Sequence, residues 1–237
     1  MFKDCRILKI TPSIYSLHFE KGFNGALTLI KQRLSQLFPE LIEITNSFNR
    51  INLIFPNDQP IKAIKSKLSS LDLEKQSVNF SAILWEIPIC FDPVFTNDLD
   101  TLFEDDLEAV IRYRHDFLAT TFTLELYGFL PGFGYLSGLP KVLQLDRKTN
   151  PNALTLKGTV GVGGAQVGVY PQDSPGGWQN IGNCPLPWIN FTKTPYTFVA
   201  IGDKVCFYEV DLAEHKRIEH EVAMGRYQPK SSSYDKS

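Results

Sequence analysis

Gly-Phe-Leu-Pro-Gly-Phe-Gly-Tyr-Leu-Ser-Gly, residues 128–138, is the stretch from which the fold of this 237-residue chain is best approached. A second glycine-rich stretch, residues 158–182, closes on Ser-Pro-Gly-Gly-Trp-Gln-Asn-Ile-Gly. Such glycine density marks positive φ angles or a backbone pressed against its surroundings, and the prolines stiffen the same loops. Two interpretations stay open: tight turns in a β-rich domain, or rigid aromatic-walled loops that form a preformed small-molecule pocket.

The N-terminal part of the chain has the periodicity of a small α+β domain. Alternating and helical apolar spacings predict, in order, strands at 5–10 and 13–19, a helix at 24–38, strands at 41–47 and 50–55, a helix at 61–71 and a strand at 81–90. The order ββαββαβ is typical of an α/β sandwich with its helices on one face of an antiparallel sheet. We therefore expect an N-terminal α+β domain over residues 1–90.

Residues 91–226 have a different pattern. A helix at 107–117 and a strand at 120–127 are followed by short strands between Gly and Pro turns, at 158–162, 166–170, 187–191 and 204–209, and by a helix at 212–223. Many short strands with such turns favour a β-barrel. Residues 227–237 are polar and are expected to form a disordered tail.

Composition narrows the functional class. The chain is 43% hydrophobic and 21% charged with a net charge of −2, which gives no electrostatic case for nucleic acid or an anionic membrane. No apolar run approaches the ~20 residues of a membrane span, and the N-terminus lacks the features of a secretory signal. Four scattered cysteines show no Cys-x-x-Cys pairing. We expect a cytoplasmic protein with free thiols and no metal site.

Several catalytic motifs are excluded because the sequence does not match their residue patterns. The glycine run at 158–164 has neither the Gly-Lys-Ser/Thr ending of a phosphate loop nor the Gly-x-Gly-x-x-Gly of a dinucleotide site, although its N–H groups could bind a carboxylate. Ser174 is followed by Pro175, so it cannot form a nucleophile elbow, and it either caps a turn or contacts a ligand. His215 and His220 lack the spacing of a zinc protease and are expected to be exposed.

Taken together, three motifs resemble a known family. Residues 128–139 match Gly-Phe-x-Pro-Gly-Phe-x-Tyr-Leu-x-Gly-Leu, and residues 158–171 match Gly-Ser-Val-Gly-Ile-x-Gly-x-Gln-x-Gly-x-Tyr-Pro with conservative changes. Residues 174–182 match Ser-Pro-Gly-Gly-Trp-x-x-Ile-Gly. In this order and spacing they resemble the family of the B-type 5-oxoprolinase subunit, the sporulation histidine-kinase inhibitor and allophanate hydrolase subunit 1. The resemblance extends, more faintly, over nearly the whole chain.

The resemblance implies a fold and an activity. It implies a cyclophilin-like β-barrel for residues 91–226, and one component of an ATP-dependent hydrolase that opens the 5-oxoproline lactam to glutamate. ATP is the implied cofactor, and a C-like subunit, together with an A-like subunit, is the implied partner. The family often has a histidine near His115, which makes His115 the acid/base candidate, with a surface histidine at a helix end as the alternative.

The motifs and the resemblance together give a set of candidate site residues. The predicted substrate-binding residues are Phe129, Pro131, Gly132, Phe133, Tyr135, Arg147, Gly163, Gln166, Tyr170, Ser174, Gly176, Gly177 and Trp178. Gln166 and Tyr170 alternate with valines, so they share one strand face and either bind a ligand or form a hydrogen-bonded core pair.

One part of the family pattern is altered. Its two Pro-Arg pairs fall at Asp146-Arg147 and Pro151-Asn152, so the first arginine is kept and the second is replaced. Asparagine cannot supply the bidentate fork of arginine, although Lys148 is a nearby cation. This change favours a second hypothesis, a non-catalytic module that inhibits a histidine kinase. A third, part of an allophanate or urea carboxylase system, has no biotin or amidase signature in this chain.

Overall fold

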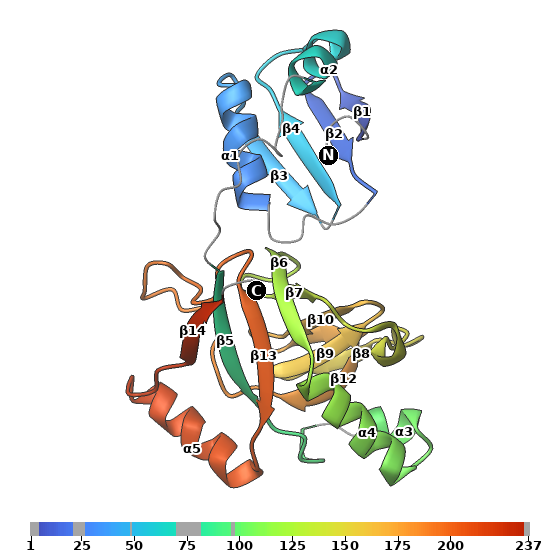
Figure 1. Ribbon diagram of the computed structural model, residues 1–237, viewed down its shortest axis with the longest axis vertical. Helices are drawn as coiled ribbons and strands as arrows, with labels where there is room; N and C mark the ends of the chain where they lie inside the picture. Colours follow the sequence, from blue (N-terminus) through green and yellow to red (C-terminus); the bar gives the residue numbers. More distant parts are fainter. Residues whose placement is uncertain (1–4, 21–26, 48, 70–81, 96–97, 235–237) are drawn as a thin grey trace. The chain divides into compact units, whose positions relative to one another are not determined.

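The computed structural model describes residues 5–20, 27–47, 49–69, 82–95 and 98–234 (Figure 1). The chain forms two compact units, Met1–Phe80 and Ser81–Ser237. The domain boundary expected at residue 90 falls at the far end of strand β5 (Ala82–Ile89), which pairs with strands of the second unit.

The N-terminal unit is a four-stranded antiparallel sheet with two helices (Figure 1). Its elements are β1 (Arg6–Thr11), β2 (Ile14–His18), α1 (Leu27–Leu37), β3 (Glu43–Ser47), β4 (Arg50–Ile54) and α2 (Ile61–Ser69), and the strand order is β1-β2-β4-β3. Alternation along β2 buries Tyr15 and Leu17, which with Leu53 of β4 lie on the face that the helices cover. The α+β class is confirmed, while the expected helix start at residue 24 and end at residue 71 lie outside the described residues.

The second unit is built on an eight-stranded mixed sheet of order β12-β9-β10-β7-β6-β13-β5-β14. The strands after β5 are β6 (Thr121–Tyr127), β7 (Gly134–Ser137), β9 (Thr159–Gly163), β10 (Gln166–Val169), β12 (Gln179–Asn183), β13 (Lys204–Glu209) and β14 (Lys230–Tyr234). A two-stranded sheet of β8 (Asn152–Thr155) and β11 (Ser174–Gly176) and the helices α3 (Asp98–Leu102), α4 (Leu107–Leu118), α5 (Leu212–Ala223) and the 3-10 turn η2 (Lys141–Leu143) complete it.

The closed barrel is not confirmed. β13 and β5 are parallel and their other neighbours antiparallel, and the sheet as paired ends at β12 and β14. A single isolated bridge joins Cys90, just after β5, to Asn183 of β12 through N–H···O bonds of 2.8 and 2.9 Å. One bridge does not make a continuous ladder, so the structure shows a mixed α+β unit with an open sheet.

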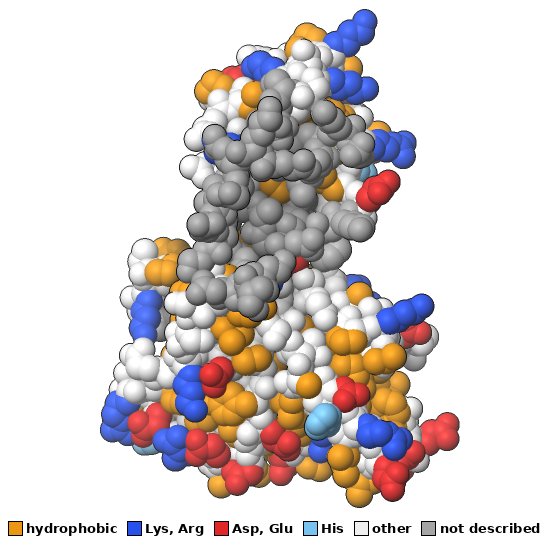
Figure 2. All heavy atoms as spheres, in the orientation of Figure 1, with side chains coloured by type: hydrophobic (Ala, Val, Ile, Leu, Met, Phe, Trp, Pro, Cys, Tyr) orange, Lys and Arg blue, Asp and Glu red, His pale blue; other side chains and the backbone are white. Residues whose placement is uncertain are grey.

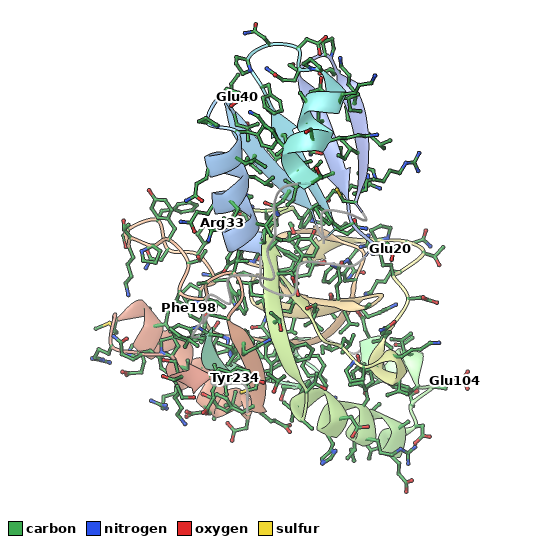
Figure 3. The ribbon with its side chains drawn as sticks, turned by 45° about the horizontal axis from the view of Figure 1, so that its top comes forward. Glu20, Arg33, Glu40, Glu104, Phe198 and Tyr234 are labelled. Carbon is green, nitrogen blue, oxygen red and sulfur yellow. The ribbon has the colours of Figure 1, made fainter. Side chains whose placement is uncertain are left out.

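The main core of this unit lies on the inner face of the large sheet. The valines of β9 and β10 are fully buried there, while the alternate positions, mainly glycines, face outward. At the margin of this core the half-buried Phe198, labelled in Figure 3, packs against Trp85 and Trp188, with ring centroids 5.2 and 5.8 Å away. The outward glycine face is the surface that matters for the site.

Three local expectations differ from the structure. No strand forms at 187–191, which is loop. In place of a disordered tail, β14 pairs with β5, because the edge of β5 offers unpaired backbone groups, and Tyr234 lies 5.6 Å from Lys204 Nζ (Figure 3). His215, expected to be exposed, is fully buried, and its Nε2 lies 2.9 Å from Asn183 Oδ1.

Candidate functional site: an aromatic hollow

The first glycine-rich stretch forms the tight connection between β6 and β7. Gly128 N–H donates to Phe133 O at 3.1 Å, and Phe133 N–H donates to Leu130 O at 3.0 Å. Gly132 has a φ of +85°, and a Cβ there would come within 2.6 Å of Ile189, so only glycine fits. The turn buries Phe133 and leaves Phe129 62% exposed.

Glycines on the outward face of β9 and β10 leave space for the rings of Phe133 and Trp178. A Cβ on Gly163 would lie 2.6 Å from the Trp178 ring, and one on Gly168 would lie 2.6 Å from the Phe133 ring. The rings of Phe133 and Trp178 therefore meet edge to face, with centroids 5.4 Å apart. Tyr170 completes this small buried cluster, 5.1 Å from Phe133. The two glycine-rich stretches thus converge on one place.

A hollow of about 350 Å³ opens beside this aromatic cluster. Eight of the predicted residues line it: Phe129, Phe133, Tyr135, Arg147, Tyr170, Gly176, Gly177 and Trp178. Lys148, Pro151 and Pro175 also line it, and our site prediction did not include them. Their proximity to Arg147 and Gly176 in sequence was the available signal.

The remaining candidates lie elsewhere. Pro131 is exposed on the turn, Gly132 faces Ile189, and Gly163 lies behind the Trp178 ring. Gln166 starts β10 opposite Gly163 and is half-buried, so of the predicted pair only Tyr170 reaches the hollow. Ser174 is buried with its hydroxyl directed at the Pro175 carbonyl.

His115 does not line the hollow. It lies near the C-terminal end of α4, with 80% of its side chain exposed, and its Nδ1 is 3.0 Å from Asp116 Oδ1. The alternative of a surface histidine at a helix end therefore describes its position.

Two cations reach the hollow, and they differ in their partners. Lys148 Nζ lies 2.6 Å from Asp98 Oδ2 and donates to Asn152 Oδ1 at 3.2 Å, so a carboxylate balances its charge. The Arg147 guanidinium lies 5.7 Å from the centre of the Trp178 ring, and no described residue forms an ion pair with it. Arg147 is therefore the cation available to a ligand.

Backbone contacts hold Arg147 in place. Lys148 N–H donates to Gly177 O at 2.8 Å, and the Gln179 side-chain amide donates to Asp146 O at 2.9 Å. The segment on either side of Arg147 is thus tied to the loop that carries Trp178.

The two tyrosines of the hollow keep their protons at neutral pH. Burial raises the pKa of both Tyr135 and Tyr170 above the usual phenol value, while the Arg147 charge acts in the opposite direction. Neutral phenols can donate a hydrogen bond to a carbonyl oxygen. The hollow therefore combines apolar walls, two hydroxyl donors and one cation.

Two absences concern only the part of the chain that the structure describes. Within it, no three His, Cys, Asp or Glu side chains are grouped so as to hold a metal ion. No helix within the same residues has the length and apolar character to cross a membrane. Cys90 and Cys184 are buried thiols that form no disulfide.

Comparison with known proteins places this geometry in a family. Residues 11–199 match the family described as carboxyltransferase domain, subdomain C and D. The chain is 28% identical over 201 residues to a Bacillus subtilis (strain 168) protein named as the B-type subunit of 5-oxoprolinase, covering 78% of this chain and 82% of that protein. It is 30% identical over 189 residues to the Escherichia coli O157:H7 protein of the same name, covering 75% and 82%.

A solved structure shares the fold. The urea carboxylase of Kluyveromyces lactis superposes with a TM-score of 0.76 at 16% identity, over 97% of this chain and 24% of that one. At that identity the likeness concerns the fold alone. With the family match and the two relatives, the chain belongs to the carboxyltransferase subdomain C and D family, together with the proteins named as B-type subunits of 5-oxoprolinase.

Proposed function

We propose that this chain is the B-type subunit of an ATP-dependent 5-oxoprolinase and that the aromatic hollow binds the lactam. The two relatives named as B-type subunits of 5-oxoprolinase support the activity. The observation that carries the site is the pairing of an aromatic hollow with Arg147, a cation that has no carboxylate partner among the described residues.

The chemistry of the ligand matches these features. 5-Oxoproline is a flat five-membered lactam with one carboxylate and one amide carbonyl. Phe129 and Trp178 offer apolar surface to the ring, Arg147 offers a bidentate fork to the carboxylate, and the Tyr170 hydroxyl is a donor for the carbonyl. A hollow of about 350 Å³ lies at the lower end of the size range of small-molecule sites.

The lining also limits what this chain does in the reaction. The lactam amide is a poor electrophile, and phosphorylation of its oxygen makes attack by water feasible. No Asp, Glu, His, Cys or Ser side chain is among the described residues that line the hollow, so the lining holds no general base or nucleophile of those types. We assign binding to this chain, and the ATP site and proton transfer to a C-like partner that acts with an A-like one.

The replacement of the family's second arginine by Asn152 leaves a lysine, Lys148, in the lining of the hollow. Asn152, which replaces an arginine of the family pattern, accepts a hydrogen bond from Lys148, and Lys148 lines the hollow. Because Asp98 balances the charge of Lys148, the catalytic hypothesis depends on Arg147. The proposal also includes a cytoplasmic location and a cyclophilin-like arrangement of the large sheet. Only the single Cys90–Asn183 bridge supports that arrangement, because the paired strands form an open sheet.

The test is co-expression with the C-like and A-like partners, followed by ADP release that depends on 5-oxoproline. We expect Arg147→Ala to raise KM by about tenfold or more, because one charge-assisted hydrogen-bond pair is lost. Arg112→Ala is the matched control, because Arg112 is exposed on α4 beside Glu108.

The outcomes separate the function from the site. A purified complex without lactam-dependent ADP release contradicts the enzyme proposal and leaves the kinase-inhibitor hypothesis. Full turnover and unchanged KM in Arg147→Ala contradict the site alone. A loss in Gln166→Ala but not in Arg147→Ala moves the site to the start of β10.

A further inference from the structure

Positive charge is concentrated in the N-terminal unit. Residues 1–80 contain 11 Lys and Arg against 7 Asp and Glu, whereas residues 81–237 contain 13 against 19. The overall charge of −2 hides this asymmetry, which predicts opposite preferences for charged ligands in the two units. Lys and Arg side chains project from the N-terminal unit beside α2 and β1 (Figure 2).

Three of its basic residues form one row across the sheet. Arg6 of β1 is opposite His18 of β2, and His18 is opposite Arg50 of β4. Residues directly opposite one another in antiparallel strands point to the same face with Cβ atoms roughly 5 Å apart. This face is the one opposite Tyr15 and Leu17, so the row lies on the side that the helices do not cover.

The row contains no balancing carboxylate. Neither arginine nor the histidine forms an ion pair with any residue that the structure describes, and both arginines are exposed. Glu43 is the one acidic residue in the four strands, and it lies opposite Ile54, whereas the row is opposite Ser47. Glu20, two residues beyond His18 and outside β2, is exposed and is the nearest described carboxylate in sequence to the row. Arg6 and Arg50 lie on the two strands that flank His18, and neither forms an ion pair with a described residue, so the row attracts an anion through the two guanidinium charges.

The surroundings of His18 show that the two arginines lie close to its imidazole ring. Its Nε2 lies 3.0 Å from Ser16 Oγ, which leaves Nδ1 without a described partner. Partial burial lowers the pKa of His18, and the charges of Arg50 and Arg6 lower it further. The two arginines are thus close enough to act on the imidazole between them.

We propose that Arg6, His18 and Arg50 form a binding site for a small oxyanion, a phosphate or carboxylate group, on the helix-free face of the N-terminal sheet. The two arginines lie on the strands at either side of the histidine, and a guanidinium can give two parallel N–H···O bonds to one oxyanion. The Ser47 and Ser16 hydroxyls flank the row on the same face. This site is distinct from the aromatic hollow and does not depend on the lactam-binding proposal.

The test follows the His18 imidazole of the full-length chain by proton NMR while inorganic phosphate or acetate is added at constant ionic strength. The His18 resonance is assigned from its absence in His18→Gln. We expect a saturable shift of that resonance, while those of His115 and His220 stay in place. We also expect about tenfold weaker binding, or more, in the double variant Arg6→Gln/Arg50→Gln.

The matched control is Lys62→Gln/Lys65→Gln, which removes the same charge from α2 in the same unit. Unchanged affinity in this control supports the row. Equal weakening in both double variants shows diffuse attraction and overturns the proposal, as does the lack of a saturable shift with either anion. Binding of phosphate alone assigns a phosphate group, binding of acetate alone assigns a carboxylate, and binding of both supports the shared site.

Discussion

Gly168→Ala is the sharpest test of how the hollow is built. A methyl group at this position would lie 2.6 and 2.7 Å from two atoms of the Phe133 ring and 3.0 Å from the Trp178 ring. Both rings are buried and pack against each other, so neither can move away without disturbing the other. Alanine in place of a strand glycine otherwise stabilises a protein by roughly 0.5–1 kcal/mol, so here the clash decides the sign.

Overpacking of a buried site costs about 1–3 kcal/mol, and we expect Gly168→Ala to destabilise the second unit by that amount. Urea unfolding followed by tryptophan fluorescence measures it, because all three tryptophans, Trp85, Trp178 and Trp188, lie in this unit. Gly177→Ala is the control, since its Cβ would meet Pro151 at an ordinary 3.5 Å.

A double-mutant cycle of Gly168→Ala with Phe133→Leu tests whether the predicted clash is the cause of the destabilisation. Phe133→Leu removes the ring that the new methyl group would meet, so Gly168→Ala should cost less in that background than in the wild-type chain. If Gly168→Ala is as stable as Gly177→Ala, or if the two changes are simply additive, the glycine face does not hold the rings as described.

Three further predictions concern other parts of the second unit. Asp203→Ala should cost about 3 kcal/mol or more in urea unfolding, because this buried carboxylate accepts bonds from Ile83 N–H and Trp85 Nε1 at 3.0 and 2.9 Å; a cost below about 1 kcal/mol contradicts this. Asp106→Ala should cost about 1 kcal/mol through loss of the α4 N-cap, with unchanged stability as the contrary result. Burial lowers the pKa of His215 from its usual 6.5, so the folded state binds a proton at this site less readily than the unfolded state does. The stabilisation that the neutral imidazole gives is therefore present above pH 6.5 and is lost as the pH falls below it. His215→Gln should flatten the pH dependence of the melting temperature below pH 6.5.

The sequence predicts local elements well where one periodicity dominates. The strands expected at 158–162 and 166–170 correspond to β9 and β10, and the apolar spacing indicated α1 and α2. The aromatic residues of the hollow were found because glycine-rich and aromatic positions share the same two stretches.

What the sequence did not show depends on contacts between distant residues. The Lys148–Asp98 pair joins a loop to the first turn of α3, and no local pattern links positions that far apart. The Lys-Ser-Ser-Ser-Tyr of β14 has no strand propensity that distinguishes it from a polar tail, and it is ordered by the free edge of β5. His215 lies in a highly charged helix, and only the packing of α5 places it against Asn183.

The same residues build the second unit and shape its hollow, which limits how function can be tested. Trp178 is 6% exposed and packed against three glycines, so Trp178→Ala removes a wall of the hollow and also destabilises the fold by roughly 3–5 kcal/mol. A loss of activity in that variant therefore says nothing about ligand binding. Arg147 is exposed and bonded to no described side chain, so its replacement changes the charge of the hollow while the packing stays intact. The charge of Arg147, and not the aromatic walls, is the feature through which binding and stability can be separated.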